Sequence, residues 1–356
     1  MNSRICETPG AQSRNTLETS ANAMPSLGRL DFLGRMPVPV RRLFKAGLDR
    51  AVAKEAEQRA PLECCFLRGG EWYQPFDALA VARNVDDVPE MIVTTLQEDI
   101  LSPRLLSFYK AGPNCADSSN YHPAFTSGEL FDPTGTFRTF AAVPFVFLID
   151  VQRLAGRPMP RIWSDLLQPR WHREIVFGGW RPNESVAYKD FNSYLLLSIL
   201  QEFGVSGLLA FASNVHHLQH NVRTTTLFGT NSRHAATIAV LPWLHAEMCP
   251  RRDNTRVVWP EDGALAMPIG YLTKGERPTR VAPLIDFVRG PELARLLGRN
   301  CYPAAGADVH NPLPVNASFK WLGWEYIYTH DLAEESIRAA RLFFSALNPS
   351  ELRACA

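Results

Sequence analysis

Residues 259–271 constrain the fold more than any other part of this 356-residue chain. The segment consists of a short strand-like start, the turn residues Pro260, Glu261, Asp262 and Gly263, and an apolar run that ends at Tyr271. Pro, Asp and Gly favour a turn, and an apolar run bounded by turn residues favours a buried strand. We therefore expect a strand, a turn, and a second strand that enters another domain.

Two upstream blocks and one downstream block have related features. Residues 140–149 form a long apolar run, which predicts a buried strand. Residues 160–171 read Pro-Arg-Ile-Trp-Ser-Asp-Leu-Leu-Gln-Pro-Arg-Trp and precede a short predicted strand at residues 174–177. After the first segment, residues 282–288 predict a helix, and Gly-Pro-Glu follows at residues 290–292.

In this order, the blocks resemble segments of the type II solute-binding proteins of ABC transporters, particularly the branch that binds iron, thiamine and polyamines. Residues 131–150 are similar to the strand that crosses to the second lobe, and residues 259–271 to the strand that returns. The resemblance covers about residues 130–306, and the N-terminal third matches only in pattern. It implies an α/β fold of two lobes, each a mixed sheet flanked by helices, joined by a two-strand hinge.

The resemblance also implies how the chain is divided. We expect lobe one to comprise residues 30–142 plus 259–347 and lobe two to comprise residues 143–258. Residues 1–28 contain few apolar side chains, so we expect a disordered tail. Within lobe one, strand, helix and strand patterns at residues 30–33, 40–59 and 62–67 predict a βαβ unit with parallel strands.

Composition excludes some classes of partner. The 37 Lys and Arg nearly balance the 36 Asp and Glu, so no global field favours nucleic acid or an anionic membrane. No uncharged apolar run reaches the roughly 18 residues that a membrane span requires. We expect a monomer that contacts a membrane only through an ABC permease, and no nucleic-acid partner.

The N-terminus and the cysteines indicate a compartment that differs from that of most relatives. Residues 1–29 lack the apolar core of a secretory signal, and the seven cysteines form no metal-type pair. Reduced thiols in the cytoplasm are the simple interpretation. We therefore predict a cytoplasmic protein, or a periplasmic one if its true N-terminus differs.

Ligands of open α/β sheets bind beyond the carboxyl ends of the strands. The site is therefore predicted from loop residues that directly follow predicted strands, together with Glu261 of the return turn. From lobe one these are Gly34, Arg35, Arg68, Gly69, Gly70, Glu71 and Thr95. From lobe two they are Trp180, Arg181, Tyr188, Asp190, Pro242, Trp243 and His245.

Pro242 and Trp243 matter most for the identity of the ligand. They stand where ferric-ion members of the resembled family have adjacent tyrosines, so the resemblance argues against ferric iron. His216 and His220 would lie one turn apart on a helix, which allows either a divalent-metal site or a polar helix surface. Cys64 and Cys65 are expected as a buried pair in a strand.

The chain lacks nucleophile-elbow, phosphate-loop, dinucleotide and zinc-protease motifs. We therefore predict binding of a small molecule or ion in an interlobe cleft without catalysis or a cofactor. The protein would be the substrate-binding component of an ABC-type transport system. The alternative is a cytoplasmic sensor or enzyme built on the same fold.

Overall fold

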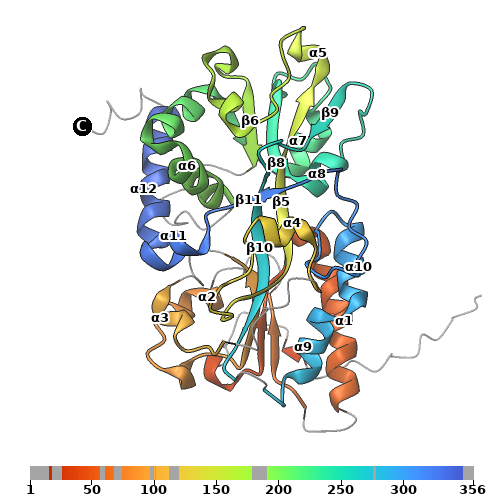
Figure 1. Ribbon diagram of the computed structural model, residues 1–356, viewed down its shortest axis with the longest axis vertical. Coiled ribbons are helices and arrows are strands. Elements are labelled where there is room, and N and C mark those ends of the chain that lie inside the picture. Colours follow the sequence, from red (N-terminus) through yellow and green to blue (C-terminus); the bar gives the residue numbers. More distant parts are fainter. Residues whose placement is uncertain are drawn as a thin grey trace, which may run out of the picture.

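A single mixed sheet runs through the length of the molecule in the computed structural model (Figure 1). Its strand order is β1-β3-β2-β4-β10-β5-β8-β6-β7, with β11 paired to β10 and β9 paired to β5. The structure describes residues 16–17, 26–56, 61–67, 74–96, 100, 102–111, 120–178, 191–275 and 278–347. This is the α/β architecture of two mixed strand groups flanked by helices that the sequence predicts.

The helices and strands follow one another along the chain with these bounds. The first part contains β1 (Thr16–Leu17), β2 (Phe32–Gly34), α1 (Val38–Ala56), β3 (Cys64–Phe66), α2 (Gln74–Leu79), β4 (Met91–Thr95), α3 (Pro103–Leu106) and α4 (Pro123–Ser127). The middle part contains β5 (Arg138–Asp150), α5 (Val151–Leu154), β6 (Ile175–Gly178), α6 (Phe191–Asn214), β7 (Val215–Gln219), α7 (Asn221–Leu227), β8 (Ile238–Pro242), α8 (Trp243–Glu247) and β9 (Thr255–Val258). The last part contains β10 (Ala264–Thr273), α9 (Ala282–Arg289), α10 (Pro291–Arg299), β11 (Phe319–Lys320), α11 (Trp324–Thr329) and α12 (Leu332–Leu347).

The 13-residue strand β5 belongs to both halves of the molecule. It pairs antiparallel with β10 from Arg138 to Phe145, and then with β8 from Phe145 to Ile149. Its side chains alternate between two buried clusters, with Val143 in one and Ala142 in the other. Because both faces are buried, almost every position of β5 is apolar, as in a central strand. The apolar run that the sequence analysis assigned to the crossing is this strand.

The return turn is fixed by the upstream block at residues 160–171. The indole N–H of Trp163 donates a hydrogen bond to the carbonyl of Gly263 at 2.9 Å, and its backbone N–H donates to the Asp262 carboxylate at 3.2 Å. Gly263 has φ of +104°, a conformation that favours glycine. Two sequence blocks that lie about a hundred residues apart therefore form one structural unit at the start of β10.

Strand directions bring carboxyl ends from the two halves toward each other. β2 and β4 are parallel, and β4 is antiparallel to β10, which is antiparallel to β5. β4 therefore runs in the direction of β5, whereas β6 and β8 run against it. Thr95 of β4 pairs with Ile269 of β10, which in turn pairs with Ala141 of β5. Pro242 of β8 pairs with Phe145 of β5. The carboxyl ends of β4 and β8 are therefore separated by four residues of β5, from Ala141 to Phe145, or about 13 Å.

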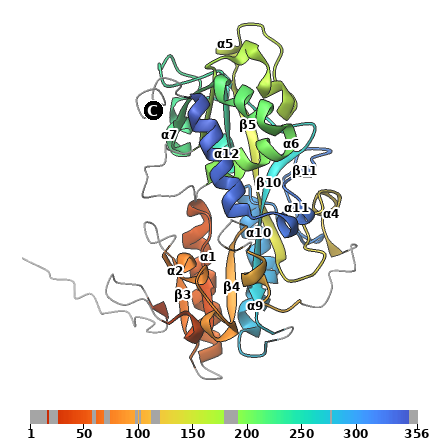
Figure 2. The ribbon, with the colours of Figure 1, turned by 90° about the vertical axis from the view of Figure 1, so that its left-hand side faces the viewer.

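Helix α6 is the most apolar helix of the described part of the chain. Its segment Ser193–Asn214 is long and apolar enough to cross a membrane, which the sequence analysis did not expect, but 56% of that window is buried inside the protein. Gly204 interrupts it with φ of +66°. Helix α12 packs along α6 (Figure 2). This burial is typical of a core helix.

The division into lobes stays a prediction, but two observations bear on its boundaries. α12 belongs to the range predicted for lobe one, yet it contacts α6, which is predicted for lobe two. Within the predicted disordered tail, Thr16 and Leu17 pair with Cys64 and Cys65 of β3. A parallel partner strand supplies backbone hydrogen bonds that composition alone does not reveal.

Trp171 tests the packing of the block at residues 160–171. Its indole is fully buried, and the guanidinium of Arg157 lies 4.8 Å from the ring centroid. Trp171→Ala should lower the free energy of unfolding by about 3–5 kcal/mol, because it empties a large buried site. Urea denaturation measures this change against Val315→Ala, a control at a position that is 92% exposed. A loss as small as that of the control would contradict the packing role.

Candidate functional site

The carboxyl edge of the first strand group holds a buried positive charge. Arg35 follows β2, is fully buried, and receives support from β4: its backbone N–H donates to Val93 at 3.0 Å, and its Nε donates to the Thr94 hydroxyl at 2.7 Å. The guanidinium carbon lies 3.8 Å from the centroid of the Phe76 ring, which is a cation–π distance. Sheet, hydroxyl and aromatic ring thus fix this guanidinium at the strand ends.

Thr95 completes this edge on the neighbouring strand. It is the last residue of β4, pairs with Ile269 of β10, and is fully buried. Its backbone carbonyl accepts a hydrogen bond from the Thr94 hydroxyl at 2.9 Å, but its own hydroxyl has no hydrogen-bond partner in the part of the chain that the structure describes. Gly34, Arg35 and Thr95, which the sequence predicts for the site, are therefore brought together on β2 and β4.

The carboxyl edge of the second strand group brings Gly178 and Asn221 together. Gly178 ends β6 and pairs with Gln219 of β7, and Asn221 begins α7 directly after that strand. A Cβ atom on Gly178 would lie only 2.2 Å from Oδ1 of Asn221, so the amide packs directly against the glycine backbone. This Oδ1 is buried and has no hydrogen-bond partner among the residues that the structure describes.

His245 lies at the same edge, in the first turns after β8. Burial, and next the neighbouring His220, lower its pKa from the ordinary value of 6.5 to about 4. Its Nδ1 atom is buried and has no hydrogen-bond partner within the described ranges. His245 is therefore a neutral imidazole near pH 7, and His220 uses its own Nδ1 to accept the backbone N–H of Val222 at 3.3 Å.

Among the described residues, three polar atoms at the two edges thus lack partners: Oγ1 of Thr95, Oδ1 of Asn221 and Nδ1 of His245. Leaving a buried polar atom unpaired costs about 1–3 kcal/mol, so native proteins keep few of them. Their occurrence at strand ends that point toward each other makes these edges a candidate site for a hydrogen-bonding ligand.

Other predicted site residues have partners within the protein. The Trp243 ring packs against Trp259 at a centroid distance of 5.3 Å, and its indole N–H donates to Glu247 at 3.0 Å. Pro242 is buried where β8 pairs with β5. Glu261 forms an ion pair with Arg161 in the return turn. These contacts account for all three side chains, and their contact with a solute stays a prediction.

The remaining predicted residues lie outside the described part of the chain. They are Arg68, Gly69, Gly70, Glu71, Trp180, Arg181, Tyr188 and Asp190. The site described above therefore rests on the strand ends themselves.

The helical interpretation of the histidine segment is wrong. Residues 215–219 form β7, which pairs with β6, and the register shifts at His216, so the rings of His216 and His217 lie 4.7 Å apart. No group of three or more His, Cys, Asp or Glu among the described residues is arranged to hold a metal ion. Asn221 was not predicted for the site for the same reason: a helix was assumed over this segment, so no strand end was expected before Asn221.

Comparisons with known proteins agree with this architecture. A family model described as bacterial extracellular solute-binding protein matches residues 86–330. No curated protein matches the chain at a significant level.

Solved structures of periplasmic and ferric-binding proteins have the same fold. The apo ferric ion-binding protein A of Pasteurella haemolytica is 10% identical with a TM-score of 0.60, covering 89% of this chain and 98% of its own. The ferric binding protein of Campylobacter jejuni is 13% identical with a TM-score of 0.59, covering 89% and 99%. The periplasmic binding protein P5PA is 18% identical with a TM-score of 0.55, covering 90% and 99%.

The family corrects the predicted compartment. The matched family is extracellular, so the prediction of a cytoplasmic protein is wrong. That prediction used the cysteines, but Cys64 and Cys65 are buried in β3, and burial raises the pKa of the Cys64 thiol to about 12. Buried thiols of this kind fill the core as small apolar groups and do not report the redox compartment.

The match spans more than half of the chain and agrees with the fold. The chain therefore belongs to the bacterial extracellular solute-binding protein family, and it is a substrate-binding component of ABC-type transport.

Proposed function

We propose that the chain binds one small solute between the two carboxyl edges, with Arg35 and Thr95 contributed by lobe one and Asn221 and His245 by lobe two. The observation that carries this proposal is the set of unpaired buried polar atoms on both edges. A solute that hydrogen-bonds to them removes a free-energy penalty that the unliganded protein bears. Hydrogen bonds from the ligand to both lobes would therefore stabilise the closed conformation.

The crossing strands suit such a closure. β5 and β10 are the two strands that pass between the halves, and the two edges lie about 13 Å apart along β5. Hinge closure changes a few backbone dihedrals and buries the ligand between two preformed surfaces. Binding and release then need no chemical step, and we propose that the protein has no catalytic activity.

The chemistry of the edges supports a hydrogen-bonding organic solute over a bare ferric ion. Thr95, Asn221 and neutral His245 offer a hydroxyl, an amide oxygen and an imidazole nitrogen, and Arg35 adds a positive charge. A hard trivalent cation prefers anionic oxygen ligands, and a nearby guanidinium opposes it. The ferric proteins named above share the fold, but at their low identity this says nothing about the ligand of this chain.

Within the family, we assign the chain to the branch that resembles iron, thiamine and polyamine carriers, on the three sequence blocks at residues 131–150, 160–171 and 259–271. It acts as a monomer that delivers its solute to a membrane permease. The link between Trp163 and the return turn supports this assignment, because two of these blocks form one structural unit.

The solute itself is the first test. Native mass spectrometry of protein purified from its own host should show a retained small organic molecule in the wild type. Asn221→Ala removes an unpaired buried oxygen from the proposed site and should lose that molecule. Thr226→Val changes an exposed residue of the same helix and should retain it. A retained ferric ion in the wild type, or equal retention by both variants, contradicts the proposal.

Thr95 provides a test that separates stability from binding. Thr95→Val replaces a buried hydroxyl that has no partner by a methyl group of the same shape, so the unliganded protein should gain up to about 1 kcal/mol of unfolding free energy. The same change should weaken retention of the solute, because the hydroxyl is proposed to bind it. Urea denaturation of ligand-free protein and native mass spectrometry measure the two effects. A destabilised variant with normal retention would refute the assigned role.

The lowered pKa of His245 predicts that the folded protein loses stability in acid. Its pKa is lowered in the folded protein, so the unfolded chain takes up a proton first, and stability falls as pH drops from about 6.5 toward 4. Between pH 7 and pH 5, His245→Gln should lose roughly 1–2 kcal/mol less stability than the wild type. Urea denaturation at both pH values, with the exposed His172→Gln as control, measures the difference. Identical pH dependence in all three proteins would show that His245 does not titrate in this way.

A further inference from the structure

A second pocket lies on lobe one, away from the two carboxyl edges. Its volume is about 930 Å³, and its walls come from α9, the start of α10, the loop at residues 305–309 and the lobe-one ends of β5 and β10. Binding sites for small molecules usually have volumes of about 300–1,000 Å³ and mostly apolar walls with a few polar groups. None of the residues assigned above to the solute site lines this pocket.

The floor of the pocket is aromatic and apolar. The rings of Phe140 and Tyr271 lie 6.5 Å apart and tilted by 39°, and both residues are largely buried. Helix α9 faces the pocket with Ala282, Ile285 and Arg289, which recur at helical spacing on one side. The opposite side of α9 packs Phe287 against Phe44 of α1 at 5.2 Å. The helix is thus held firmly from behind and presents a fixed wall.

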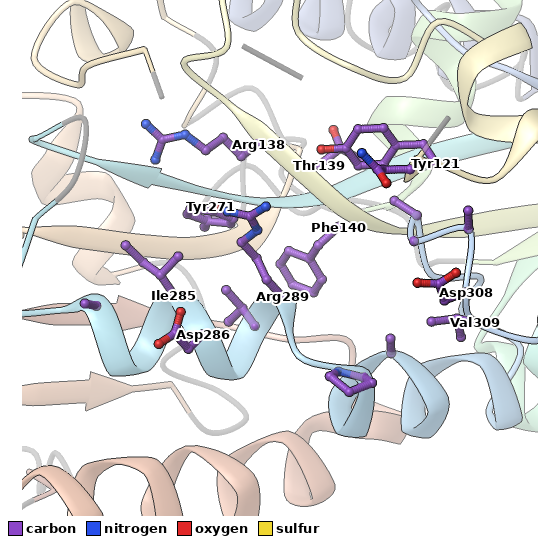
Figure 3. Close-up of a pocket in the computed structure, with 18 of the residues that line it drawn as sticks. Tyr121, Arg138, Thr139, Phe140, Tyr271, Ile285, Asp286, Arg289, Asp308 and Val309 are labelled. Carbon is purple, nitrogen blue, oxygen red and sulfur yellow. The ribbon is translucent and has the colours of Figure 1, made fainter. Parts of the chain in front are cut away.

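Side chains of opposite charge lie on two sides of the aromatic floor formed by Phe140 and Tyr271. Figure 3 shows Arg289 extending from α9 toward Tyr271, and Asp308 on the loop beyond Phe140. Within the described part of the chain, neither side chain forms a hydrogen bond or an ion pair, and the same holds for Asp286. Arg138, the other cation at the pocket, already donates to Thr273 at 2.5 Å and to the Lys110 carbonyl at 2.9 Å. Arg289 is therefore the cation that this geometry offers to a ligand.

We propose that this pocket is a second ligand site, for a small zwitterion whose apolar body separates an anionic end from a cationic end. The anionic end pairs with Arg289, the cationic end pairs with Asp308, and the body lies on Phe140 and Tyr271. A ligand with only one charge would pair with either Arg289 or Asp308 and leave the other side chain without a ligand charge of opposite sign. The class to test is therefore the ω-amino acids, whose two charges are joined by a methylene chain.

Calorimetric titration with ω-amino acids from 4-aminobutanoate to 8-aminooctanoate tests the proposal, with hexanoate and hexylamine as singly charged controls. The best ω-amino acid should bind more tightly than either control. Arg289→Ala and Asp308→Asn should each weaken it by about two- to fivefold, the range expected for a solvent-accessible ion pair. Arg295→Ala removes an exposed cation of α10 that does not line the pocket and should leave binding unchanged.

The results that overturn the proposal are equally specific. Absence of binding by the whole series excludes the zwitterion site, and so does equal binding of the singly charged controls. Asn221→Ala provides the check on location, because it alters the solute site between the lobes and should leave binding of the ω-amino acid intact. Loss of binding in this variant would place the molecule between the lobes, whereas the solute-site proposal itself would stand.

Discussion

The change of partner along β5 is the interaction on which the rest of the structure depends. Up to Phe145 the strand pairs with β10, and from Phe145 onward it pairs with β8. One strand thereby joins two groups of strands that run in opposite directions, and their carboxyl ends point toward each other. Both faces of β5 are buried, which is why this strand is apolar at nearly every position.

This arrangement explains why much of the fold was predictable and where prediction stopped. Long apolar runs, turn residues and the block ending in Trp171 specify local structure strongly, so the two crossing strands were located from the sequence. The helix pattern at residues 216–220 was misleading, because pairing of β7 with β6 outweighs local spacing when the segment completes a sheet. The error hid Asn221, which only becomes a strand-end residue once β7 is known.

The candidate site shows a similar division. Gly34, Arg35 and Thr95 follow from the rule that ligands bind at the carboxyl ends of strands. Trp243 follows a strand as well, but its ring turns into the aromatic cluster with Trp259, and no sequence signal distinguishes these two orientations. The candidate site is identified by buried polar atoms that have no hydrogen-bond partner among the described residues. This property depends on the folded structure, so the sequence alone does not reveal it.

The packing of α12 on α6 has a consequence for biosynthesis. Helix α6 is complete when the ribosome has made Asn214, but its partner α12 begins only at Leu332. During that interval the most apolar helix of the described chain has one side uncovered, in a segment that resembles a membrane span in length and composition. Nascent chains with exposed apolar surface are prone to aggregate and are recognised by chaperones. Late docking of α12 therefore prolongs the interval in which α6 can aggregate or be bound by a chaperone.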